Sequence, residues 1–170
     1  MTIFYEEFTN NLSFIDNNDN SSQYQTHLNY AYIITCTERY FSKAMIDTMD
    51  ANQECYEQIA KKINHTAKLS TIFGKGLNKF IKEDILVNFQ YHNIYQVKIY
   101  YKNAFNIDFP PNIKWLQEAV GKRHDIVHRC GFSKKNELLN ISFDDVEQLR
   151  EKVTKLIHDI DKQLESKYYI

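Results

Sequence analysis

The chain has few of the residues that turn-rich or cross-linked folds need. Its 170 residues include only four glycines and two prolines, the residues that interrupt helices and build tight turns. A β-sandwich is therefore disfavoured and long helices are favoured. The three cysteines Cys36, Cys55 and Cys130 are odd in number and show no C-x-x-C spacing. We expect reduced thiols rather than a disulfide framework.

Long apolar runs and a strong net charge are also lacking. No apolar run approaches the roughly 20 residues of a membrane span, and no secretory signal opens the chain. We therefore expect a cytoplasmic protein with no membrane partner. The net charge of −1 excludes a bulk polycation. Any grip on nucleic acid must then come from a locally basic surface.

What the chain does contain is enough apolar material for one core. Hydrophobic residues make up 43% of the sequence, with 12 tyrosines and 11 phenylalanines among them. Residues 1–22 differ from the rest, because they carry four acidic residues and no lysine or arginine. We predict an acidic, polar N-terminal segment over 1–22, with a short docking helix at 3–15 and a polar loop at 16–22. A single domain over 23–170 follows it.

Cap signals and apolar spacing divide that domain into helices. Ser22 with Gln25 is a capping-box signal for a long helix, whose apolar face comprises Leu28, Ala31, Ile34, Phe41, Met45 and Met49. Asp50 with Gln53 predicts the cap of a second helix. The segment 65–76 is interpreted as a loop, and a third helix is expected from about Leu77.

The second half of the chain contains the clearest helix signals. Residues 94–105 fit strand alternation and helix spacing equally well, and helix is preferred because Asn93 can cap it. Pro110-Pro111 breaks the chain before a helix at 113–130, which Gly131 ends. A loop or small hairpin at 132–141 precedes the last helix, which Ser142 caps with Asp144 and Asp145 in its first turn. We predict an all-α bundle of about five to six helices.

One stretch of the 113–130 helix combines two chemically informative residues. Arg123 is followed, after four intervening residues, by His128. RNA cleavage by its own 2′-hydroxyl requires a base, an acid and stabilisation of the extra phosphate charge. Histidine suits the proton transfers because its ordinary pKa is near 6.5. Arginine suits the phosphate because its fork binds two oxygens and stays charged.

Helix geometry sets how these two residues can cooperate. At about 100° per residue, Arg123 and His128 lie about 140° apart around the helix. A site that combines them from two chains about a two-fold axis is cleaner than a site within one chain. His128 lies in the last turn, where the negative end of the helix favours the protonated imidazole.

The charge around the motif is positive. Residues 114–137 hold six basic and three acidic side chains, an excess of three positive charges in a chain of net −1. Lys122, Lys134 and Lys135 are the candidate RNA contacts within this segment. Asp125 and Arg129, four residues apart, are expected to form a surface pair beside the motif.

A zinc site is the alternative for the two histidines of this helix. His124 and His128 have the four-residue spacing of zinc ligands. The H-E-x-x-H pattern is absent, however, and the sequence offers no identifiable third ligand. We expect neither a metal nor a cofactor.

Three segments carry a resemblance to a known family: Phe89–Asn93, Gly121–Gly131 and Ile141–Val146. Together they resemble the HEPN superfamily of helical ribonucleases, in particular its RiboL-PSP-HEPN or MAE-type branch, over roughly residues 24–165. The resemblance implies a bundle that dimerises through the motif helix. It implies metal-independent endoribonuclease activity that leaves a cyclic phosphate and a 5′-hydroxyl, in toxin–antitoxin or antiphage systems.

The resemblance also assigns roles to residues. It makes Arg123 and His128 the catalytic pair and His124 the variant residue that follows the arginine. Glu38, on the first long helix, is the candidate for a polar residue near the site. One departure is Cys130, because partner-silenced HEPN toxins carry a tyrosine at this position. That form of silencing is therefore not expected here.

Two functions are consistent with these residues. The first is an RNA endonuclease acting on tRNA or mRNA as a homodimer, with a possible cognate antitoxin or regulatory partner. The alternative is a non-catalytic HEPN interaction module, such as an antitoxin, an immunity protein or a regulator. In that alternative Arg123 and His128 serve in a structural ion pair, with Asp125 as the acidic partner, or in an interface contact.

Overall fold

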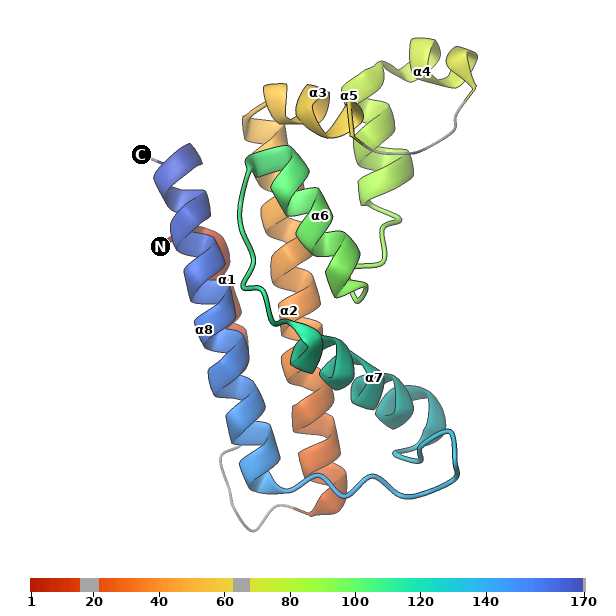
Figure 1. The fold of residues 1–170 in the computed structure, drawn as a ribbon, viewed down its shortest axis with the longest axis vertical. Coiled ribbons are helices and arrows are strands. Elements are labelled where there is room, and N and C mark those ends of the chain that lie inside the picture. Colours follow the sequence, from red (N-terminus) through yellow and green to blue (C-terminus); the bar gives the residue numbers. More distant parts are fainter. Residues whose placement is uncertain (16–21, 63–67, 170) are drawn as a thin grey trace.

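A computed structural model describes residues 1–15, 22–62 and 68–169, and within these ranges every regular element is a helix (Figure 1). The predicted all-α fold is confirmed. Apart from one isolated bridge, Phe132 with Leu138, no β-pairing occurs in these ranges. The elements in chain order are α1 (Ile3–Leu12), α2 (Gln23–Ala51), α3 (Glu54–Ala60), α4 (Leu69–Lys75), α5 (Leu77–Phe80), a π-helical turn η1 (Ile81–Leu86), α6 (Ile94–Phe105), α7 (Lys114–Arg129) and α8 (Phe143–Tyr168).

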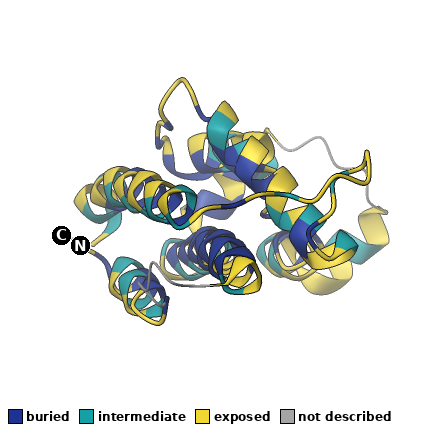
Figure 2. Ribbon diagram, turned by 90° about the horizontal axis from the view of Figure 1, so that it is seen from below, coloured by how far each residue is buried: buried dark blue, intermediate teal, exposed yellow. Residues whose placement is uncertain are grey.

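The long helix α2 is the centre of the fold. It packs against α1, α7 and α8, and α6 and α3 pack together near its C-terminal end (Figure 1). Seen from below, α2 is buried on several sides, whereas α8 is buried on one side and exposed on the other (Figure 2). The fully buried residues of α2 include Ile33, Ile34, Phe41, Met45 and Met49. Because α2 contacts α7 directly, it positions the motif.

Three of the predicted caps form. The Ser22 side chain accepts a hydrogen bond from the Gln25 amide at 3.2 Å. Asn93 caps α6 in the same way, which confirms that residues 94–105 are helical. Ser142 and Asp145 form a reciprocal capping box at the start of α8. Local side-chain chemistry therefore sets the starts of these helices.

Other boundaries differ from the prediction. Asp50 does not begin a second helix, because α2 continues to Ala51 and keeps Met45 and Met49 buried. The Asp50 carboxylate instead accepts a hydrogen bond from the Tyr56 hydroxyl at 2.6 Å. Residues 69–75 form α4 rather than a loop, and this helix buries none of its residues. Leu28, assigned to the apolar face, is 43% exposed.

The N-terminal segment docks through α1, as predicted. Phe4, Phe8 and Leu12 are buried against the bundle. The buried carboxylate of Asp161 in α8 accepts hydrogen bonds from the Thr2 amide at 2.8 Å and from the Tyr40 hydroxyl at 2.9 Å. These contacts join α1, α2 and α8. The predicted polar loop lies mostly outside the described residues, as does the start of the 65–76 segment.

No helix among the described residues is both long enough and apolar enough to cross a membrane.

Candidate active site

The motif helix α7 is fixed at both ends. It follows Pro110-Pro111 and buries Leu116, Ala119, Val120 and Ile126. It ends in two left-handed residues, Cys130 and Gly131, and the Gly131 amide donates to the Asp125 carbonyl at 3.1 Å. Gly131 also lies against the ring of His27 in α2. A Cβ built at Gly131 would lie 2.6 Å from His27 Cε1. The helix end carrying His128 is thereby held against α2.

Arg123 lies on the inner side of α7, close to Glu38 of α2. Burial raises the pKa of Glu38, and the positive charge of Arg123 partly opposes that rise. Arg123 Nε and Glu38 Oε1 are buried without hydrogen-bond partners, and no ion pair joins these two side chains within the described part of the chain. Arg123 and Glu38 therefore interact electrostatically, while Arg123 Nε and Glu38 Oε1 form no hydrogen bond. This arrangement leaves the guanidinium able to bind an anion.

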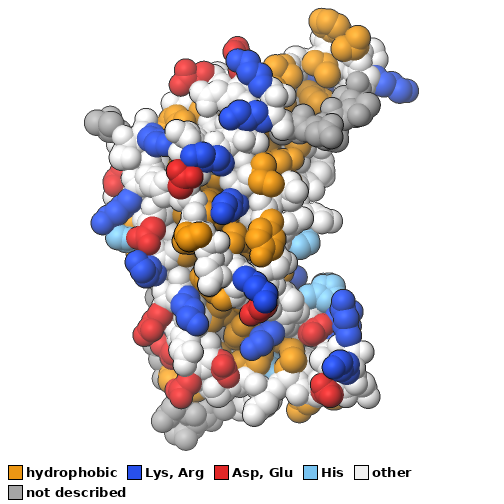
Figure 3. All heavy atoms as spheres, viewed as in Figure 1, with side chains coloured by type: hydrophobic (Ala, Val, Ile, Leu, Met, Phe, Trp, Pro, Cys, Tyr) orange, Lys and Arg blue, Asp and Glu red, His pale blue; other side chains and the backbone are white. Residues whose placement is uncertain are grey.

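A third charged group, His92, belongs to the same cluster. It is exposed on the turn before α6, and its positive charge also acts to lower the pKa of Glu38. Glu38 and His92 line one open groove with a volume of about 500 Å³. In Figure 3, histidine side chains lie on both sides of a recess between the start of α6 and α7. The cluster thus joins residues from three separate segments.

The two histidines of α7 contact each other. The ring centroids of His124 and His128 are 4.6 Å apart, and both side chains are exposed. Desolvation lowers the pKa of His124, and the charges of His128 and Arg129 lower it further. At neutral pH His124 is therefore biased towards the neutral form that accepts a proton. The predicted pair of Asp125 and Arg129 forms as an ion pair.

The predicted RNA contacts do not all share one surface. Lys134 and Lys135 line a groove of about 690 Å³ together with His124 and Arg129. Lys122 lies elsewhere, with its ammonium 5.6 Å from the centre of the Tyr30 ring. It lines a separate groove that also contains Asp145. The basic surface beside the motif is therefore built by the 129–137 segment and excludes Lys122.

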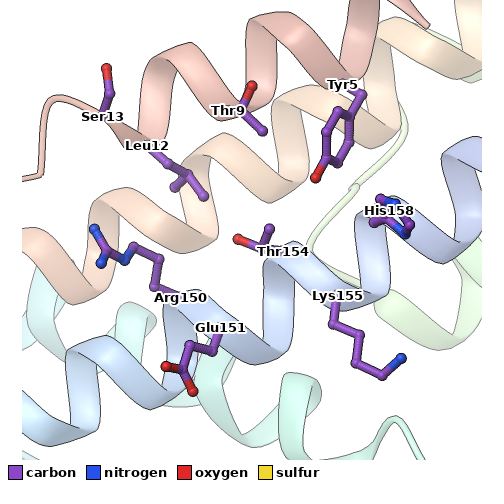
Figure 4. Close-up of a pocket in the computed structure, with 9 residues that line it drawn as sticks. All are labelled: Tyr5, Thr9, Leu12, Ser13, Arg150, Glu151, Thr154, Lys155 and His158. Atoms are coloured by element: carbon purple, nitrogen blue, oxygen red, sulfur yellow. The ribbon is translucent and has the colours of Figure 1, made fainter. Parts of the chain in front are cut away.

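A fourth groove lies between α1 and α8, and the motif residues do not line it (Figure 4). Its volume is about 560 Å³, and its lining includes Tyr5, Thr9, Arg150 and His158. In Figure 4 Tyr5 and Leu12 point from α1 towards α8, whereas Ser13 and Lys155 point away from the groove. This groove has no counterpart in the sequence-based prediction.

Sequence reasoning named Glu38 as a polar residue near the motif, and the structure places it where the charge of Arg123 acts on its carboxylate. Sequence reasoning did not name His92 as a candidate, although it lies directly before the Asn93 cap, in a segment already singled out by the resemblance. Within the described residues, no three His, Cys, Asp or Glu side chains gather as a metal-binding group. In comparisons with protein-family models, curated proteins and solved structures, none significantly matches this chain.

Proposed function

We propose that this protein is a metal-independent endoribonuclease of the HEPN type. It cleaves RNA by promoting attack of the RNA's own 2′-hydroxyl on the neighbouring phosphorus. The observation that carries the proposal is Arg123, whose buried Nε has no partner, beside Glu38 and next to an exposed histidine pair. A free guanidinium and titratable imidazoles supply the charge stabilisation and proton transfers that the reaction needs.

Each residue has a chemical role in this proposal. Arg123 binds the non-bridging phosphate oxygens and stabilises the charge that develops on them. His128 transfers a proton in the attack or the departure step, and neutral His124 supports proton acceptance. Glu38 orients Arg123 through its charge. Lys134 and Lys135 hold neighbouring phosphates, because they line the groove that contains His124.

A homodimer fits this arrangement. Arg123 faces α2 and is half-buried, whereas His128 is exposed. Val127, between them on the helix surface, is 52% exposed. A second copy placed about a two-fold axis would cover this apolar residue and bring two motif helices together. We propose a cytoplasmic toxin or antiphage effector acting on tRNA or mRNA, restrained by a cognate antitoxin or regulatory partner.

The test is cleavage of total RNA and of a tRNA pool by the purified protein in the presence of EDTA. We expect the wild type to leave cyclic phosphates and 5′-hydroxyls, and both His128→Ala and Arg123→Ala to be inactive while still folded. Arg123→Lys keeps the charge but loses the fork, so it should retain only part of the activity. His158→Asn, on α8, is the matched control and should cleave normally. Metal dependence or an active His128→Ala protein contradicts the proposal.

The second candidate, a non-catalytic interaction module, is favoured by an apolar stripe on α2. Tyr24, Leu28 and Tyr32 follow one another at four-residue spacing and are 71%, 43% and 38% exposed. Exposed apolar residues grouped on one helix face suit a protein partner. A folded wild-type protein that turns over none of the RNAs tested would support this function instead.

A further inference from the structure

We infer that His92 is a further catalytic residue, which lines the groove beside Glu38 and protonates the leaving oxygen of a bound RNA phosphodiester. The inference rests on the proposed ribonuclease function and deepens it. It places the reacting phosphate at this groove, beside the Glu38 carboxylate on which the charge of Arg123 acts. The sequence resemblance assigns no role to His92.

His92 and Glu38 line the same open groove of about 500 Å³, which the Tyr91 and Ser42 side chains also line. The charges of Arg123 and His92 both act on the Glu38 carboxylate. Segments that lie far apart in the chain therefore converge on one point. Figure 3 shows a recess between the start of α6 and α7 that is open to solvent and has histidine side chains on both sides, so a polynucleotide strand can approach this part of the surface.

The charged side chains in and beside this groove differ in whether they have ion-pair partners. Two other cations line the groove from α2, but each already has a carboxylate partner. Arg39 Nη2 lies 2.6 Å from Glu7, and Lys43 Nζ lies 2.9 Å from Asp47. Glu38, His92 and Arg123 form no ion pair within the described part of the chain. They are the charges that remain available to a substrate.

The turn that carries His92 is rigid, as proton transfer requires, because the donor must stay within hydrogen-bond reach of its target. The Asn93 amide donates to the Gln90 carbonyl at 2.8 Å, which closes the turn around His92. The preceding Phe89 stacks on Tyr100, with ring centroids 4.4 Å apart, and meets Tyr91 edge to face at 4.9 Å. The exposed His92 side chain thus projects from a turn that is held by a hydrogen bond and by aromatic packing.

The reaction balances with two histidines. The RNA 2′-oxygen forms a bond to phosphorus while a motif-helix histidine accepts the hydroxyl proton. The bond from phosphorus to the 5′-oxygen breaks, and His92 donates a proton to that oxygen. The products are a 2′,3′-cyclic phosphate and a 5′-hydroxyl. Solvent exchange then returns each histidine to its starting form, so no cofactor or oxidant is consumed.

The test compares His92→Asn with the wild type on a short RNA in EDTA over a range of pH. We expect kcat to fall by about 10²–10⁴-fold with KM nearly unchanged, and the limb of the pH–rate profile that requires a protonated acid to disappear. His158→Asn is the matched control and should retain both limbs. Because His92 is exposed, thermal unfolding of the variant should match that of the wild type.

A substrate with sulfur in place of the bridging 5′-oxygen makes the assignment specific. A thiolate leaves without a proton, so His92→Asn should cleave this substrate at nearly the wild-type rate, whereas Arg123→Ala should not. An active wild type with His92→Asn within threefold of it, or a variant that the sulfur substrate does not rescue, overturns the inference and leaves the proposed function standing. A wild type that cleaves neither substrate overturns both.

Discussion

Substitution of Gly131 by alanine should detach the end of the motif helix from α2. Gly131 has a φ of +84°, and its position against the His27 ring leaves no room for a Cβ. Such a Cβ would lie 2.6 Å from Cε1 and 2.8 Å from Nδ1 of that ring. Either the ring or the glycine backbone must therefore move. The His27 ring is buried and bonded to its surroundings, so its movement has a cost.

The cost follows from two contributions. A left-handed backbone costs a non-glycine residue about 1–2 kcal/mol. Displacing the His27 ring also breaks the hydrogen bond between its Nε2 and the Leu139 carbonyl at 2.8 Å, worth about 1 kcal/mol. The ring atoms that lose packing add to this. We expect Gly131→Ala to lower the free energy of unfolding by about 2–4 kcal/mol.

Urea unfolding followed by circular dichroism measures the change. Gly121→Ala is the matched control within the same helix, because a Cβ there meets nothing within 4 Å. It should raise the free energy of unfolding by about 0.5–1 kcal/mol, as alanine is the better helix former. Combining Gly131→Ala with His27→Ala removes the clash, so the double variant should lose less than the sum of the two single changes. A Gly131→Ala protein within 0.5 kcal/mol of the wild type, a threshold set by ordinary surface substitutions, would refute the reasoning.

Two further predictions concern RNA affinity and pH. In a cleavage-inactive background, Lys134→Ala and Lys135→Ala should each weaken RNA binding and reduce the slope of log K against log salt by about 1, whereas Lys122→Ala should change the slope less. Filter binding over a potassium chloride series would show equal slopes for all three if the groove assignment is wrong. Hydrogen bonds from Ser142 lower the pKa of Asp145 below its ordinary 3.8, so its stabilisation is present above that pH and is lost as pH falls through the lowered value. Asp145→Ala should therefore cost about 1 kcal/mol at pH 7 and progressively less as pH falls through the lowered pKa in urea melts, and a pH-independent cost would contradict the capping role.

The helices that sequence reasoning placed correctly have strong local signals. Ser22, Asn93 and Ser142 each begin a helix, because the side-chain oxygen accepts a hydrogen bond from the backbone amide three residues later. This interaction depends only on residues that are close in sequence. Local signals also misled. Asp50 and Gln53 have the same cap spacing, yet α2 continues past Asp50 to Ala51 because its buried face extends to Met49. Tertiary packing therefore decides between a cap and a continued helix.

The candidate site could be predicted only in part, for a physical reason. Arg123 and His128 lie on one helix, so their spacing in sequence sets their geometry. Glu38 comes under the charges of Arg123 and His92 through the packing of α2, α6 and α7, which no local pattern encodes. The Lys122 prediction shows the same limit. Counting charges along the sequence assigns Lys122 to the same basic segment as Lys134. In the structure Lys122 lies on another side of α7, next to Tyr30 and away from the groove that Lys134 lines.

Under the proposed function, the distribution of charge explains how a chain of net −1 would hold RNA. The acidic residues of α1 lie across α2 from the motif helix, and one of them, Glu7, is engaged by Arg39. Lys134 and Lys135 sit on the α7 side, where they share a groove with His124. Screening by salt reduces exposed attractions beyond about 10 Å, so phosphates next to this groove respond to its local excess of positive charge and little to the distant acidic helix. Binding then depends on which face the RNA meets, and the face that attracts phosphate is the one that carries the motif.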